Sequence, residues 1–162
     1  MKRNLLLVLT LVCLCSFASA QTKMTSTWTC PKQDPSQTKS LEVPDKAGHA
    51  YVIFQFKCTA NSGDVAGSTE KEGSGTEFVD ATGDTSTGHG VFMETLASGD
   101  KLRTTYTSKS TMKGGQFVSG TNKFQIAGVS GKAKGIKGSG TCEGKGNPDG
   151  SSSWTCTWTS AK

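Results

Sequence analysis

The residues with the most reactive side chains are few in this chain and do not form a recognisable catalytic set. There are two histidines, His49 and His89, and neither lies in a motif that pairs it with a nucleophile. We expect His89, in the sequence Gly88-His-Gly90, to be a solvated residue at the start of a strand. His49 is expected to close a long surface loop. Nucleophilic catalysis is therefore not predicted.

Glu94 is the carboxylate with the clearest potential for acid–base chemistry. It alternates with Phe92 and Leu96, so the three side chains share one face if the segment is a strand. If that face points inward, burial would raise the pKa of Glu94 and make it a candidate general acid or base. In the opposite register, which we favour, Val91 and Met93 face the core and Glu94 meets water.

The other candidate chemistry is weaker. For Asp80, which is near Phe78, the sequence does not decide whether the side chain points into the barrel or toward solvent. The glycine-rich pair Gly131-Lys132 is followed by Ala133 and lacks the spacing of a phosphate-binding loop. We predict no cofactor and no metal, and we regard Glu94 and Asp80 as weak catalytic candidates only.

Four cysteines follow the N-terminal segment: Cys30, Cys58, Cys142 and Cys156. An even number predicts two disulfides if the chain is exported, which the N-terminus described next indicates. Zinc is the alternative, but the spacings contain no C-x-x-C pair. We favour Cys30 with Cys58 and Cys142 with Cys156. The rival pairing, Cys30 with Cys156 and Cys58 with Cys142, stays open.

The N-terminus has the pattern of a secretory signal. Lys2 and Arg3 precede an apolar run over residues 5–15, and Ala18-Ser-Ala20 supplies small residues for cleavage. The apolar run is shorter than the roughly 20 residues that span a bilayer. We therefore predict a cleaved signal peptide at 1–20 and one secreted or periplasmic domain at 21–162, with no stable membrane insertion after cleavage.

The rest of the chain predicts an all-β fold. It is rich in Gly, Ser and Thr and has short alternating segments without helical periodicity. Strands separated by tight turns at about ten-residue spacing indicate an up-and-down antiparallel β-barrel of eight or nine strands, since closure removes unpaired edges. The expected strands are 24–30, 50–60, 65–72, 75–82, 89–97, 101–109, 115–127 with an interruption at 119–120, 136–144 and 152–160. Residues 31–48 are expected to be a long loop.

The sequence of the last two expected strands, 136–144 and 152–160, indicates how they pair. If Cys142 lies opposite Cys156 in an antiparallel pair, Gly144 lies opposite Trp154. By the same register, Trp158 lies opposite a glycine. The tryptophans would then cover positions that have no side chain, which restores packing there.

Charge is unevenly distributed along the chain. Residues 21–100 hold 6 Lys and 11 acidic residues, whereas residues 101–162 hold 9 Lys, 1 Arg and 2 acidic residues. The basic residues are spread singly among Gly, Ser and Thr and are not interleaved with aromatics, so we expect a solvated face and no nucleic-acid partner. The oligomeric state is not predicted.

The run Lys123–Thr141, followed by the turn Gly146-Asn-Pro-Asp-Gly150 and Trp154, resembles the C-terminal signature of the allene oxide cyclase barrel-like proteins. The sequence departs from that pattern at Val129-Ser130 and in its two cysteine pairs. The resemblance implies a calycin-like or allene oxide cyclase-like barrel. Many bacterial proteins of this kind are exported and have no assigned activity.

Three functions fit these features. The first is a barrel that binds a small apolar ligand. The second is an allene oxide cyclase-like isomerase, on the strength of the resemblance. The third is an envelope interaction module that uses the basic C-terminal half. The predicted ligand-lining residues are Trp28, Phe54, Phe56, Phe92, Tyr106, Trp154 and Trp158.

Overall fold

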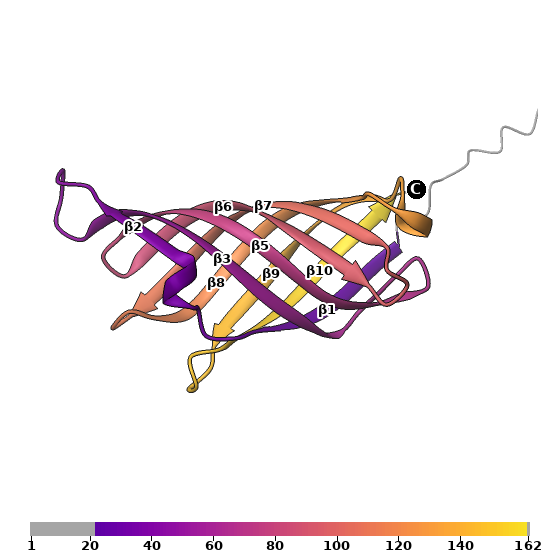
Figure 1. Cartoon of the computed structure of the whole chain (residues 1–162), viewed down its shortest axis with the longest axis horizontal. Coiled ribbons are helices and arrows are strands. Elements are labelled where there is room, and N and C mark those ends of the chain that lie inside the picture. Colours follow the sequence, from indigo (N-terminus) through magenta and orange to yellow (C-terminus); the bar gives the residue numbers. More distant parts are fainter. Residues whose placement is uncertain (1–21, 162) are drawn as a thin grey trace, which may run out of the picture.

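The computed structural model describes residues 22–161, and the expected signal peptide lies outside them (Figure 1). The described chain is almost entirely β-structure, as predicted. Its elements are β1 Thr22–Cys30, the 3-10 helix η1 Pro35–Gln37, β2 Thr38–Glu42, β3 His49–Ser62, β4 Asp64–Val65, β5 Ser68–Thr82, β6 Thr85–Leu96, β7 Lys101–Lys113, β8 Gln116–Gly128, the 3-10 helix η2 Gly131–Ala133, β9 Lys137–Gly146 and β10 Ser152–Ala161. None of the helical segments between residues 22 and 161 has the length and apolar character to cross a membrane.

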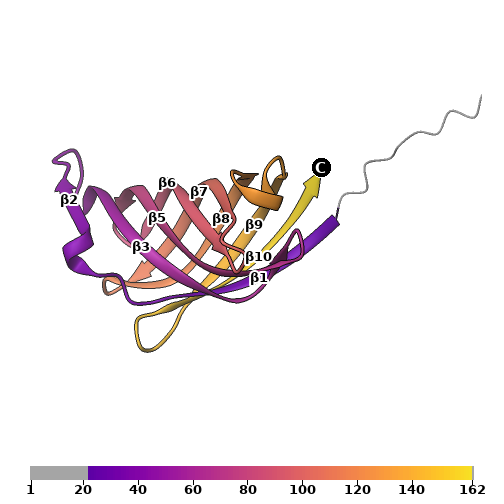
Figure 2. The same cartoon turned by 45° about the vertical axis from the view of Figure 1, so that its right-hand side comes forward.

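Eight antiparallel strands close into a barrel. The order is β1, β10, β9, β8, β7, β6, β5 and β3, and β3 returns to pair with β1. Strands from β5 to β10 follow one another around the wall, as an up-and-down barrel requires (Figures 1 and 2). The short strand β2 lies outside this circle and pairs only with the first half of β3. The predicted barrel is thus confirmed, with eight strands.

Both favoured disulfides are present, Cys30–Cys58 and Cys142–Cys156. The rival pairing is therefore wrong, and these four cysteines are not zinc ligands. The first disulfide joins β1 to β3, where the barrel closes, and the second joins β9 to β10. Each bond links neighbouring strands through side chains on the inner face of the wall.

The predicted register of the last hairpin is also confirmed. Cys142 pairs with Cys156, Gly144 with Trp154 and Gly140 with Trp158. A Cβ atom built on Gly144 would lie 2.6 Å from the indole ring of Trp154. The ring therefore occupies the space that any side chain at this glycine would need.

The structure differs from the expected strands around Gly73 and Gly75. We expected a turn there, but β5 runs without a break from Ser68 to Thr82, and both glycines face inward. The ring of Phe92 packs on Gly73 and that of Phe56 packs on Gly75. These glycines serve close ring packing and not a turn. β8 is continuous through the expected interruption at 119–120, but its pairing with β7 shifts register beside it, between Ser119 and Phe117. The expected loop 31–48 contains η1 and β2.

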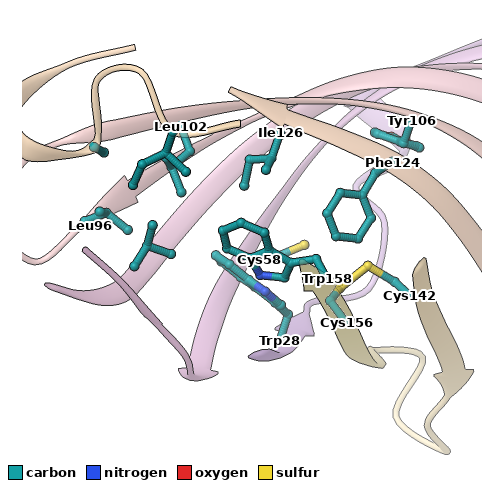
Figure 3. Close-up of a cluster of buried hydrophobic side chains, with 13 residues drawn as sticks. Trp28, Cys58, Leu96, Leu102, Tyr106, Phe124, Ile126, Cys142, Cys156 and Trp158 are labelled. Atoms are coloured by element: carbon teal, nitrogen blue, oxygen red, sulfur yellow. A yellow bond between two sulfur atoms is a disulfide. The ribbon is translucent and has the colours of Figure 1, made fainter. Parts of the chain in front are cut away.

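One end of the barrel is closed. Leu96 and Leu102 are fully buried at this end, together with Val65 of β4 and Ala133 of η2. The buried core extends from Leu96 and Leu102 through Ile126 and the tryptophans toward Tyr106 (Figure 3). The β4 turn and η2 thus contribute side chains that fill this end.

The opposite end is more open. Its inward-facing side chains, Val52, Val79, Ser86 and Ser110, remain partly exposed. They lie near the β5–β6 and β7–β8 turns, where β2 flanks the wall. The barrel interior therefore meets solvent from this end.

Candidate functional site

The aromatic residues predicted to line the barrel do face its interior, and four of them form a chain of ring contacts. The ring centroids of Trp28 and Phe92 lie 5.4 Å apart, those of Phe92 and Phe56 lie 5.8 Å apart, and those of Phe56 and Phe54 also lie 5.8 Å apart. The rings of Phe56 and Phe92 are stacked, which is one of the favoured aromatic arrangements. This chain connects β1, β6 and β3 across the interior.

The remaining predicted lining residues occupy other parts of the interior. Tyr106 and Trp158 are buried, and Trp154 is half-buried with its ring 5.5 Å from that of Phe117. The structure thus places all of the predicted aromatics on the inner face. Trp28, Tyr106 and Trp158 belong to one hydrophobic core cluster, against which Phe56, Phe92 and Trp154 pack, and Phe54 joins it through Phe56.

A polar cluster lies between these aromatics, centred on Glu77 of β5. The Tyr106 hydroxyl donates a hydrogen bond to Glu77 Oε2 at 3.0 Å, and the Ser108 hydroxyl donates one to Glu77 Oε1. Glycines on the intervening strand β6 make this possible. A Cβ atom at Gly90 would lie 2.5 Å from the Tyr106 hydroxyl, and one at Gly88 would lie 2.6 Å from Glu77 Oε1.

The electrostatics of this cluster follow from its position inside the wall. Burial raises the pKa of Glu77, and the hydrogen bonds from Ser108 and Tyr106 oppose that rise because they favour the carboxylate. Burial also raises the pKa of Tyr106, and the neighbouring Glu77 carboxylate adds to the effect. Tyr106 therefore acts as a hydrogen-bond donor to Glu77 at neutral pH.

Asn122 of β8 extends the polar surface beyond Ser108, which it faces directly across the β7–β8 pair. Its Oδ1 atom is buried and has no hydrogen-bond partner. Most buried polar groups in proteins do have such a partner. The inner face opposite Ser108 therefore has a buried acceptor that no protein group satisfies.

A second acidic group lies toward the closed end, where Glu70 and Glu94 are 5% and 4% exposed. Burial, reinforced by the charge of Glu70, raises the pKa of Glu94 to about 9. Burial raises the pKa of Glu70 to about 7, an effect that a hydrogen bond with Ser26 opposes and the charge of Asp64 reinforces. Glu70 Oε2 and Glu94 Oε1 have no hydrogen-bond partner.

The favoured expectation that Glu94 meets water is wrong. Glu94 shares the inner face with Phe92 and Leu96, and Val91 is on the outer face with 37% of its surface exposed. The physical reason is that the Phe92 ring fills the space over Gly73, which fixes the facing of the whole strand. The other weak candidate, Asp80, lies on the outer face.

Asp80 instead contacts His49, which also contacts Asp45; we call these three residues the His49 clasp. His49 Nδ1 lies 2.5 Å from Asp45 Oδ1, and His49 Nε2 lies 3.1 Å from Asp80 Oδ1. The hydrogen bond to His49 lowers the pKa of Asp45. β3 begins at His49, as expected for the residue that closes the loop, and the contact with Asp80, which was not predicted, ties this segment to the outer wall.

His89 is exposed, as expected, but it lies within β6 and not at the start of a strand. Its side chain is on the outer face, with its ring centroid 5.4 Å from that of Phe78. Two depressions lie nearby and share Asp80, Thr87, Lys109 and Thr121, and the first also borders Ser86 and Ser110 at the open end. None of the predicted aromatic lining residues borders either depression.

The sequence reasoning missed Glu77, Ser108 and Asn122. The signal for Glu77 was that Gly73, Gly75 and Glu77 follow one another at intervals of two residues, which places all three on one face of a continuous strand. Interpreting the glycines as a turn broke that pattern. Within residues 22–161, no three His, Cys, Asp or Glu side chains are grouped so as to hold a metal ion.

The fold and interior define a small, disulfide-linked, antiparallel β-barrel with an acidic and aromatic inner face. No protein-family model matches the chain, and no curated protein matches it.

Proposed function

We propose that the protein is an exported β-barrel that binds a small, largely apolar ligand inside the barrel. The observation that carries this proposal is the asymmetry of the two ends. Leu96 and Leu102 are fully buried at one end, whereas the inward-facing Val52, Val79 and Ser110 are partly exposed at the other. A ligand would enter at this second end.

The lining of the interior supports the proposal. The interior of an eight-stranded barrel is either filled by side chains or able to hold one small ligand. Ligand sites are mostly apolar and contain a few polar groups that set orientation. Phe54 and Tyr106 provide apolar surface here, and Glu77 with Ser108 provides the polar group.

Export is supported by the covalent structure. Disulfides such as Cys30–Cys58 and Cys142–Cys156 form and persist in oxidising compartments. The N-terminal sequence has the charged, apolar and small-residue regions of a secretory signal. Together they favour a secreted or periplasmic location.

Blocking the open end is expected to abolish binding of an apolar probe. The neutral fluorescent dye Prodan, titrated into the protein without its signal peptide, should show a blue shift and a saturable increase in emission. In Ser110→Trp the new side chain faces inward at the open end, so we expect at least a roughly tenfold loss of affinity, equivalent to about 1.4 kcal/mol.

The adjacent substitution Thr111→Trp is the matched control, because Thr111 is exposed on the outer face of the same strand. It should leave dye affinity unchanged. Equal loss in both variants, or no saturable binding to the wild-type protein, would argue against an internal site.

A second candidate function is acid–base isomerisation of the allene oxide cyclase type. It is favoured by the carboxyl groups of Glu70 and Glu94, whose pKa values are about 7 and about 9. Such values suit a base and an acid near neutral pH. Incubation with an allene oxide should then give an enantiomeric excess in the cyclised product, which Glu94→Gln removes; a racemic product from the wild-type protein would exclude this activity.

A further inference from the structure

The acidic or basic side chains that face into the barrel are all carboxyl groups. Among the eight strands that close the wall, those that point inward are Glu70, Glu77 and Glu94. The lysines and the arginine of the same strands are exposed on the outer face, among them Lys109 and Lys123. The interior is therefore acidic, whereas the chain as a whole has a net charge of +5.

The interior also contains more hydrogen-bond acceptors than its own donors satisfy. Asn122 Oδ1 is buried without a partner. The carboxylate of Glu77 accepts one hydrogen bond at each oxygen, and a carboxylate has lone pairs for about four. A ligand that fits this interior must therefore donate hydrogen bonds.

We propose that the ligand is an organic cation, a protonated amine on an apolar body, with its ammonium group placed at Glu77. This inference rests on the proposed ligand-binding function and names the class of ligand. An ammonium group carries three donors and no acceptor. It matches both the negative charge of Glu77 and the free acceptor of Asn122.

Glu77 is the carboxylate that such a ligand reaches first. It is only partly buried, whereas Glu70 and Glu94 lie deep at the closed end. The aromatic side chain of Phe54 lies directly opposite Glu77 on β3, and Tyr106 bonds to it from β7. Aromatic faces attract cations, so these rings strengthen the preference for an ammonium group.

The proposal also predicts a change in protonation when the ligand binds. A nearby cation favours the ionised form of a carboxyl group, so binding of an ammonium ion lowers the pKa of Glu77 and releases any proton that this group still holds in the free protein. The other titratable groups close to Glu77 are Tyr106, which donates to it, and His89 on the outer face of β6. A neutral ligand produces no such release.

The test compares three probes of the same size: phenylbutylamine, phenylbutanol and phenylbutyrate. Isothermal titration calorimetry near neutral pH, in buffers with different ionisation enthalpies, measures affinity and proton release together. Hydrogen bonds to charged groups contribute about 1.5–3 kcal/mol, so the amine should bind roughly tenfold to a hundredfold more tightly than the alcohol. The carboxylate should bind most weakly.

Glu77→Gln should remove this preference for the amine and leave the affinity for the alcohol almost unchanged. Glu72→Gln is the matched control, because Glu72 lies on the same strand but is exposed on the outer face. The comparison of the three probes in the wild-type protein remains decisive even if Glu77→Gln does not fold.

The outcomes separate this inference from the function on which it rests. Equal binding of amine and alcohol, or tighter binding of the carboxylate, would overturn the cation proposal and leave the ligand-binding barrel intact. If neither Prodan nor any of the three probes binds, both proposals fail.

Discussion

Replacing Trp158 by Ala is expected to lower the free energy of unfolding by about 3–5 kcal/mol, the range found for removal of a large buried aromatic side chain. Trp158 is 3% exposed and packs over Gly138 and Gly140 of the neighbouring strand. Because those glycines have no side chains, nothing on that strand moves easily into the space that the ring leaves. The cost should therefore lie toward the upper part of this range.

Denaturant unfolding, followed by circular dichroism, measures this loss. Trp154→Ala is the matched control, because Trp154 also packs over a glycine, Gly144, on the same pair of strands but is only half-buried. Trp154→Ala should lower stability by less than Trp158→Ala does. A loss below about 1 kcal/mol for Trp158→Ala would show that the ring is not central to the core.

Raising the pH from about 5 to about 8 is expected to lower stability by several kcal/mol through Glu94 and Glu70. Their pKa values in the folded protein are about 9 and about 7, above their ordinary value of 4.5. The folded state therefore binds more protons than the unfolded state between pH 4.5 and these values. Stability falls as pH rises through this window, by about 1.4 kcal/mol per pH unit for each group.

Glu94→Gln tests the origin of this pH dependence. It keeps the shape of the side chain but does not titrate, so the variant should lose much of the slope and become more stable than the wild-type protein near pH 8. Glu72→Gln, at an exposed position of β5, should leave the slope unchanged. Two results would contradict this account of Glu94 as a buried carboxyl group with no partner for its ionised form. One is stability that rises with pH in this window, and the other is an unaltered pH dependence of stability in Glu94→Gln.

The last hairpin was predictable because several local signals agree. Cys142 and Cys156 fix a register, the turn at residues 146–150 fixes the reversal, and the same register aligns Trp154 with Gly144. Each of these signals comes from residues that are near one another in sequence. The disulfide pairing and the class of fold follow from such patterns without knowledge of distant contacts.

The interior polar site was not predictable in the same way. Gly73 and Gly75 are compatible with a turn or with close packing, and the rings that decide between the two come from β6 and β3. The facing of Glu94 depends on the same contact, because both faces of its strand carry apolar residues. Sequence alone therefore left open which side chains line the barrel.

The His49 clasp on the outer wall also depends on a contact between residues that are distant in the sequence. His49 contacts Asp45 nearby in sequence and Asp80 on a distant strand, and only the pairing of β3 with β5 brings the two carboxylates to one imidazole. No spacing rule in the sequence indicates such a contact. Tertiary pairing determines the role of this histidine.

The most direct test of the ligand-binding barrel is to locate a bound apolar probe by NMR. The isotope-labelled protein without its signal peptide would be titrated with Prodan, and intermolecular NOEs would be assigned to side chains. We predict contacts to the inward-facing Phe54, Tyr106 and Trp154. NOEs confined to the exposed outer residues Tyr51 and Phe78, with none inside the barrel, would contradict the proposal.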